Sequence, residues 1–280
     1  MDKLLQWSIA QQSGDQEAMA RIGQPDSKML EQLFGGPDEP TLMKQSITIV
    51  NDPEVELEQK EIALENFEML IENLDNANNI GNLKLWPSLI KLLNDDVEER
   101  LRFLACSIIG TAVQNNPKSQ EDFISSEGGL GKLIHIVEHD ASKEIQLKAL
   151  YAISSVLRNF QPGYVQFVEN QGWDILKGGD NKRTIRILSV VSSILSNGID
   201  VEIHQHIKQQ QLPSLLISVL NQDSNVNLID KAVNILVELH KNQYPFTSQE
   251  IESIKSGIEQ IKTVEHLNQD DLTAITSSFI

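Results

Sequence analysis

Residues 100–115 read RLRFLACSIIGTAVQN, and residues 144–159 read EIQLKALYAISSVLRN. The two stretches carry apolar and polar side chains in nearly the same order, 44 residues apart. Ala105 recurs as Ala149 and Ile109 as Ile153. The same spacing continues in three further pairs, Asn115 with Asn159, Phe123 with Phe167, and Gly128 with Gly172. The chain therefore repeats a structural unit of about this length.

A helical repeat with a period near 40 residues is typical of an armadillo or HEAT solenoid. Asn116-Pro117, Gly128-Gly129 and the Asn94-Asp-Asp96 cap divide each unit into a short, a medium and a long helix. Three helices per unit favour the armadillo form, because HEAT units have two. We predict an all-α, armadillo-like right-handed helical solenoid of about four repeats plus helical caps. Each unit of such a stack packs only on its neighbours, and the stack offers a long binding face.

The rest of the chain fits this division. We predict long helices over Leu57–Leu74 and in the later units Trp173–Leu195 and Ile203–Leu239, with a medium helix over Asn82–Leu93. The polar tail Ser248–Leu267 reads as a closing cap. Residues 1–40 form a separate helical or flexible segment that ends in the linker Gly35-Gly-Pro37, and residues 41–280 form the repeat domain. The first segment is either a cap for the solenoid or a mobile arm.

Charge and composition limit the partners. The 280 residues have a net charge of −17, which argues against nucleic acid and against an anionic membrane surface. No segment has the roughly 18 uninterrupted apolar residues of a membrane span, and the N-terminus has no apolar stretch of signal-peptide length. Cys106 is the one cysteine, so no intrachain disulfide forms. We predict a cytoplasmic protein, with the nucleus as the alternative compartment.

Catalytic motifs are missing from the sequence. It has no glycine-rich phosphate loop, no HExxH and no Cys-x-x-Cys. His135 and His139 stand four residues apart and could share a metal, but a surface helix pair without a third ligand is the favoured interpretation. Cys106 lies between apolar residues and is predicted to be buried. We therefore predict a protein that is not an enzyme and that holds no cofactor or metal.

The polar sides of the long helices are the candidate contact surface. In the second long helix the stripe is Arg100, Ser107, Thr111 and Gln114, and 44 residues later it is Glu144, Tyr151, Ser155 and Arg158. The first long helix carries an acidic stripe of Glu58, Glu61, Glu65, Glu68 and Glu72. Charge runs are often only solvated faces, and the binding interpretation depends on the stripe lying inside the groove.

Tryptophan placement weakens one use of such a groove. Armadillo receptors for nuclear-import signals carry Trp and Asn ladders on their third helices. Here Trp86 and Trp173 begin medium helices, and packing explains them better. A receptor for basic import peptides is therefore disfavoured, although the acidic stripe keeps it open.

Several stretches together resemble one family. They are Leu4-Leu-Gln-Trp-Ser-Ile9, Leu33-Phe-Gly-Gly-Pro-Asp-Glu-Pro-Thr-Leu-Met-Lys44, Asn66-Phe-Glu-Met-Leu-Ile-Glu-Asn-Leu-Asp-Asn-Ala-Asn-Asn79 and Ser107-Ile-Ile-Gly-Thr-Ala-Val-Gln-Asn-Asn116. They look like the Fes-type armadillo nucleotide exchange factors of cytosolic DnaK-type heat-shock chaperones, the seventy-kilodalton class. The resemblance implies a monomeric co-chaperone that embraces one lobe of the chaperone's ATPase domain and promotes release of ADP and then of substrate. It also implies that the N-terminal segment contacts the chaperone's substrate-binding side.

The resemblance and the stripes together give a set of predicted contacts. Glu65, Glu68 and Glu72 would meet a basic patch on the chaperone lobe. Ala77, where the first long helix ends, is a small residue that would let the partner approach closely, and Asn78 beside it would be a further contact. Gln114, Asn115, Arg158 and Arg186 would continue the contact along the groove. The alternative from another class is a passive armadillo scaffold or transport adaptor, which would bind without changing nucleotide release.

Overall fold

A computed structural model describes residues 37–280, in which all regular secondary structure is helical. The chain divides after Gln45, and the larger unit is Ser46–Ile280. Most of the helical or flexible segment predicted over residues 1–40 lies outside the described residues. The predicted all-α fold is confirmed for the part that the structure describes.

The helices follow one another in groups of three, as the repeat predicts. α4 (Glu39–Asn51) and α5 (Leu57–Ile71) come first. The units that follow are α6 (Leu74–Asn82), α7 (Trp86–Lys91) and α8 (Glu99–Val113); α9 (Pro117–Ile124), α10 (Gly129–His139) and α11 (Lys143–Leu157); α12 (Gln161–Glu169), η1 (Gly172–Ile175) and α13 (Asn181–Leu195); and α14 (Val201–Gln209), α15 (Leu212–Ser218) and α16 (Val226–Lys241). α17 (Ser248–Ile261) and α18 (Gln269–Phe279) close the chain. Residues 37–280 thus hold the predicted four units.

Three helix assignments differ from the prediction. The medium helix expected over Asn82–Leu93 is the shorter α7, Trp86–Lys91, because Asn82 is the last residue of α6. The helix expected over Leu57–Leu74 ends at Ile71, because Asn73 caps a new helix by accepting a hydrogen bond from the Asp75 amide at 2.9 Å. The Asn76 side chain also donates to the Leu70 carbonyl at 2.9 Å and so satisfies the end of α5. In the third unit Trp173 lies in the 3-10 turn η1 rather than in a medium helix.

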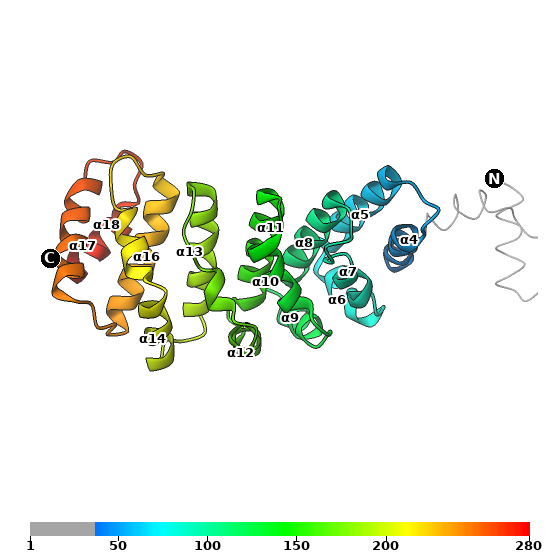
Figure 1. Cartoon of the computed structure of the whole chain (residues 1–280), viewed down its shortest axis with the longest axis horizontal. Helices are drawn as coiled ribbons and strands as arrows, with labels where there is room; N and C mark the ends of the chain where they lie inside the picture. The colour runs from blue at the N-terminus through cyan, green and yellow to red at the C-terminus, as the bar shows by residue number, and fades with distance from the viewer. Residues whose placement is uncertain (1–36) are drawn as a thin grey trace, which may run out of the picture. The chain divides into compact units, whose positions relative to one another are not determined.

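Within Ser46–Ile280 the long third helices form one row. α5 packs on α8, α8 on α11, α11 on α13 and α13 on α16. Figure 1 shows these helices side by side in chain order, from cyan through green to yellow. The shorter helices make a second layer that covers the apolar sides of the row, with Phe67, Phe123 and Phe167 fully buried. Solvent therefore meets mainly the polar sides of the third helices, although Ile62 and Met69 on α5 are also exposed.

The asparagines that mark the repeat end the third helices. Asn115 follows α8 and Asn159 follows α11, each with a φ of 52° in the left-handed region. Asparagine tolerates this conformation better than most residues, so its recurrence after 44 positions has a backbone cause. Gly128 meets the same need before α10, with a φ of 76°.

Three predicted burials agree with the structure. Trp86 is 2% exposed and Trp173 is 4% exposed, which confirms that both tryptophans pack in the interior. Cys106 on α8 is fully buried, and burial raises the pKa of its thiol to about 12. A thiol this far from ionising is no nucleophile near neutral pH.

Candidate partner-binding surface

The outward sides of α5, α8, α11, α13 and α16 form what we call the third-helix face. Two depressions lie along it. The larger, of about 530 Å³, lies where α8, α11 and α13 meet, and the smaller, of about 260 Å³, lies between α13, α16 and the end of α11. Both are lined by polar and charged side chains together with a few aliphatic ones. The row of helices thus provides shaped sites where a partner could dock.

The outward side of α5 carries the acidic surface, which comprises Glu58, Glu61, Glu65 and Glu72. Part of its charge is neutralised within the chain. Arg100 on α8 reaches back, with Nη2 2.6 Å from a Glu65 carboxylate oxygen and Nε 3.9 Å from one of Glu61. Within residues 37–280, Glu58 and Glu72 form no ion pair.

Glu68, the remaining predicted acidic contact, is engaged with its neighbour helix. The Ser107 hydroxyl donates to Glu68, and Lys148 Nζ on α11 donates to the Ser107 oxygen at 2.9 Å. This relay joins three third helices in one line. Glu68 is half-buried, so it presents less charge to a partner than Glu72 does.

Ala77 and Asn78 lie elsewhere than the sequence suggested. Both belong to α6, the first helix of the next unit, and not to the end of the long helix. The Ala77 side chain is only 3% exposed, because α6 turns it inward beside Ile80. It therefore offers a partner almost no surface directly, and any role in binding would act through packing. Asn78 is half-buried, with Oδ1 3.4 Å from the Ser119 hydroxyl.

The other predicted contacts lie at the ends of the third helices or on their outward side. Gln114 is the C-cap residue of α8, and its side-chain oxygen accepts a hydrogen bond from the Tyr151 hydroxyl at 3.2 Å. Asn115 follows it and is exposed. Arg158 ends α11 and lines the smaller depression, and Arg186 on α13 lines the larger one.

A row of alternating cations and aromatic rings crosses the third-helix face. The Arg100 guanidinium lies 5.3 Å from the centre of the Phe103 ring, and Lys148 Nζ lies 5.1 Å from the same ring. Lys148 also lies 5.7 Å from the Tyr151 ring, whose other neighbour is Arg186 at 5.6 Å. Cation–π contacts of this kind hold long charged side chains in place over a helix surface.

Tyr151 owes its position to a glycine on the preceding helix. A Cβ on Gly110 would lie 2.4 Å from the Tyr151 ring, so no larger residue fits there without moving the ring. The missing side chain at this point of α8 leaves room for the Tyr151 ring where α8 packs on α11. The sequence contains Gly110 within the repeated stretch but gives no sign of its contact with Tyr151.

Beyond Tyr151 the face becomes positive. We call Lys148, Arg158, Lys182, Arg186 and Lys231 the basic cluster, which spans α11, α13 and α16. Desolvation lowers the pKa of Lys231 first, and the nearby positive charges of Arg158 and Arg186 lower it further. Arg158 and Arg186 therefore each lie close enough to Lys231 to repel its charge.

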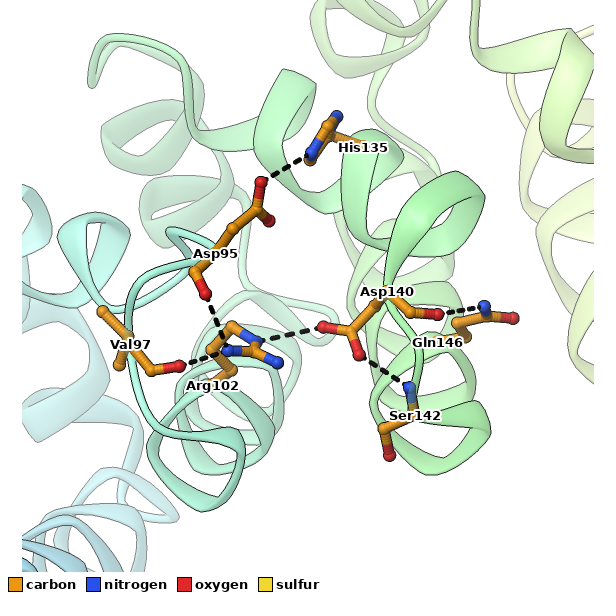
Figure 2. A network of polar contacts seen from close by, with 7 residues as sticks. All are labelled: Asp95, Val97, Arg102, His135, Asp140, Ser142 and Gln146. Carbon is orange, nitrogen blue, oxygen red and sulfur yellow. Dashed lines mark hydrogen bonds and ion pairs between the residues drawn. The ribbon is translucent and has the colours of Figure 1, made fainter.

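Side chains from α8 and α9 hold the two ends of α11, and Figure 2 shows the contacts at its start. Arg102 Nε on α8 lies 3.0 Å from the Asp140 carboxylate, and both side chains are largely buried. The guanidinium also donates to the Asp95 and Val97 carbonyls. Asp140 in turn accepts from the Ser142 amide at 2.8 Å.

The C-terminal end of α11 is held by a buried amide. Gln120 Nε2 on α9 lies 2.9 Å from the Ser155 carbonyl, 3.0 Å from that of Val156 and 3.1 Å from that of Arg158. It thereby satisfies carbonyls that the helix end leaves without a partner. The Gln120 side chain thus holds the backbone at Arg158 in place from the buried side of the helix end.

Sequence reasoning missed Phe103, Lys148, Lys182 and Lys231 on this face, as well as the supporting pair Arg102 and Asp140. Lys148 and Lys231 come from different repeats, so only an alignment of all the third helices would have shown them together. The buried pair has no periodic signal, since Gln146 stands 44 residues after Arg102.

The histidine pair has other partners than a metal. His135 Nε2 lies 3.1 Å from an Asp95 carboxylate oxygen, and its ring packs edge-on against His139 at 4.6 Å. Among residues 37–280 no group of three or more His, Cys, Asp or Glu side chains could hold a metal ion.

Comparison with known proteins identifies the family. The family described as "Nucleotide exchange factor Fes1" matches residues 1–80, and the "SIL1/FES1/HPBP1 C-terminal domain" matches residues 73–235. The Hsp70 nucleotide exchange factor FES1 of Scheffersomyces stipitis is 56% identical over 98% of both chains. The protein of that name from Saccharomyces cerevisiae is 44% identical over 98% of this chain and 99% of its own. The chain belongs to the Fes1 family.

Solved structures confirm the armadillo fold of this Fes1 family member. A designed armadillo repeat protein in complex with the peptide (KR)4 has a TM-score of 0.69 at 18% identity, covering 87% of this chain and all of its own. A second designed armadillo repeat protein has a TM-score of 0.68 at 17% identity, with the same coverage.

Membership of the Fes1 family also confirms the predicted class of activity. A nucleotide exchange factor acts by binding and makes or breaks no covalent bond, so this Fes1 protein is not an enzyme. Over the described part of the chain, every helix is too short or too polar to cross a membrane.

Proposed function

We propose that this Fes1 protein binds the ATPase domain of a cytosolic Hsp70-class chaperone on its third-helix face and speeds the release of ADP. One observation carries the proposal. Relatives named Hsp70 nucleotide exchange factor match the chain from end to end, at 56% identity in one yeast and 44% in another. Identity of this extent over whole chains leaves little room for a different arrangement of the repeats.

The activity follows from differential affinity. If the third-helix face fits the ATPase domain better when its nucleotide cleft is open, binding shifts the domain toward the open form. ADP then leaves, ATP enters, and substrate is released. Linkage requires the reverse effect of the same size, so nucleotide must weaken the complex. Couplings of this kind amount to about 1–3 kcal/mol, or about 5–150-fold in affinity.

Several details of the complex are part of the proposal. The partner would cover exposed charges at both ends of the face, with Glu65 and Glu72 on one side and Arg158 and Arg186 on the other. Glu68, Asn78, Gln114 and Asn115 would lie within or beside the contact, and Ala77 would support it from inside α6. Residues 41–280 would carry the groove, and the segment 1–40 would act as a separate arm. We expect a monomer in the cytoplasm, with a nuclear pool.

The test is the release of a fluorescent ADP analogue from a purified cytosolic Hsp70-class chaperone. Wild-type protein should speed release several-fold or more, and excess ADP should weaken the complex. A charge reversal on the face, Arg158→Glu, should reduce the acceleration. A matched reversal at Lys208 on α14, an exposed residue outside the third helices, should leave it unchanged.

The passive adaptor remains the rival. It predicts binding to the chaperone with an unchanged rate of ADP release and no effect of nucleotide on affinity. That result would refute exchange activity while leaving the binding face intact. Ala77→Arg is a poor probe of this question, because the buried position would disturb the fold of α6.

A further inference from the structure

The basic cluster contrasts with the chain that carries it. The protein has 40 acidic residues against 23 Lys and Arg, yet five cations gather on one side of three neighbouring helices. None of the five forms an ion pair with any residue between 37 and 280. Lys148 donates to the neutral hydroxyl of Ser107 instead.

Cations this close to one another repel, and nothing on the face compensates for this in full. Arg158 and Arg186 act on Lys231, which is half-buried. Two carboxylates, Glu144 and Glu238, line the two depressions, and neither lies within ion-pair distance of a cation of the cluster. An arrangement that costs free energy in the isolated chain gains it when a partner brings the opposite charge.

The larger depression has the build of a site for a side chain with an acidic end. Lys148, Lys182 and Arg186 supply positive charge, and Leu147 and Ile185 supply apolar wall between them. The aromatic rings of Phe103 and Tyr151 flank Lys148 and limit where its ammonium group can lie. A volume of about 530 Å³ is enough for one or two side chains of a partner.

We propose that the depression between α8, α11 and α13 binds carboxylate side chains of an acidic segment on the partner protein, with Lys148, Lys182 and Arg186 as the ligands. The identification of that partner as the Hsp70-class ATPase domain depends on the proposed function. The chemistry of the site does not. The acidic segment would be the contact that fixes the register of the partner along the row of helices.

The surroundings favour carboxylates over a nucleic acid. A rod-like polyanion that crossed the basic cluster would continue toward α5, where Glu58 and Glu72 carry unneutralised charge. It would also approach a chain with a net charge of −17, which repels long polyanions. A short acidic segment of a folded protein need not reach the glutamates of α5, and it brings less negative charge near the chain than a long polyanion does.

The experiment uses the full-length chain and two probes. The first is a hexaglutamate peptide, whose binding is measured by titration calorimetry at low salt with wild type, with the double variant Lys182→Glu/Arg186→Glu, and with the control Lys208→Glu. The second is the chaperone itself, whose affinity is measured over a range of salt concentrations. An oligouridine RNA and a hexalysine peptide serve as competing probes.

The expected result is weak, salt-sensitive binding of hexaglutamate to wild type and to Lys208→Glu, and loss of at least tenfold in the double variant. The double variant should also bind the chaperone at least tenfold more weakly, with a shallower salt dependence. The proposal is overturned if the oligouridine binds more tightly than hexaglutamate, or if the double variant keeps wild-type affinity for both probes. If wild type fails to speed ADP release, the proposed function fails, and the hexaglutamate titration still decides whether the site exists.

Discussion

The acidic surface on α5 and the basic cluster on α11, α13 and α16 share one face but differ in how the chain treats their charge. Arg100 crosses from α8 to meet Glu61 and Glu65, so the fold itself neutralises part of the acidic side. Lys182, Arg186 and Lys231 receive no such partner from residues 37–280. The difference suggests that the acidic surface serves folding and binding together, whereas the basic cluster is kept for a partner.

The backbone of α11, which carries part of the basic cluster, is held firmly at both ends. α11 is held at its start by Arg102 of the preceding unit and at its end by Gln120 of α9, in its own unit. Its outward residues therefore rest on a fixed backbone. A preorganised surface loses less conformational entropy on binding, so the underlying contacts contribute to affinity without touching the partner.

Arg102→Met should give the largest effect. It removes the partner of Asp140, whose side chain is 3% exposed, and leaves an uncompensated buried carboxylate. We expect a loss of about 3–5 kcal/mol in the free energy of unfolding. Urea denaturation followed by circular dichroism measures it.

The control for this prediction is the double variant Arg102→Met/Asp140→Asn. It removes both charges and keeps an oxygen that can accept from the Ser142 amide, so it should recover much of the lost stability. Equal stability of the single and double variants would show that the buried charge is not the cause.

Gln120→Ala should have the next largest effect. Three carbonyls at the end of α11 lose their shared donor in a buried place, at a cost of about 1–3 kcal/mol. Because Arg158 sits at this helix end, we also expect weaker binding to the chaperone. Gln205→Ala on the exposed side of α14 is the matched control and should change neither quantity. Full stability of Gln120→Ala would mean that water replaces the amide.

Alkaline pH should lower the free energy of unfolding through the buried thiol of Cys106 on α8. Burial holds the pKa of Cys106 at about 12 in the folded chain, above its ordinary value of 9.0. The stabilisation that this gives is complete below pH 9 and is lost as the pH rises toward 12. Between pH 8 and pH 10 we expect a loss of about 1.4 kcal/mol from this thiol.

Denaturation midpoints of wild type and Cys106→Ala at both pH values measure this effect. The variant should lose less stability over the same interval, although the pKa values of Tyr164 and Tyr244, also raised by burial to about 12, leave it some sensitivity. An equal loss in both proteins would assign the effect to the tyrosines.

Much of the fold was predictable because it is periodic. The 44-residue spacing of Asn115 and Asn159 reflects a left-handed residue directly after the cap of α8 and of α11. The break between α5 and α6 was missed, since the apolar pattern continues through Leu74 and only the Asn73 cap ends the helix. Local capping chemistry overrode the periodicity there.

The site was predictable only in outline. Arg158 and Arg186 could be placed on the face from their helix register, but their convergence on Lys231 depends on how three units stack. Ala77 shows the opposite failure. A resemblance pointed to the position, while the inward turn of α6 that buries it is a tertiary effect.

The smallest effect should come from a comparison of two glutamates on α5. Arg100 already neutralises Glu65, whereas Glu72 is exposed and forms no ion pair among residues 37–280. If a basic patch of the chaperone meets this surface, Glu72→Gln should weaken binding by about 0.5–1 kcal/mol, in the range of exposed ion pairs. Glu65→Gln should weaken it less, because Arg100 already offsets the Glu65 charge and still has Glu61 as a partner in the variant. Affinities measured at low salt separate the two, and the difference should vanish at high salt. Equal losses in both variants would mean that the partner displaces Arg100 and takes Glu65 for itself, which would make the acidic surface as open to a partner as the basic cluster.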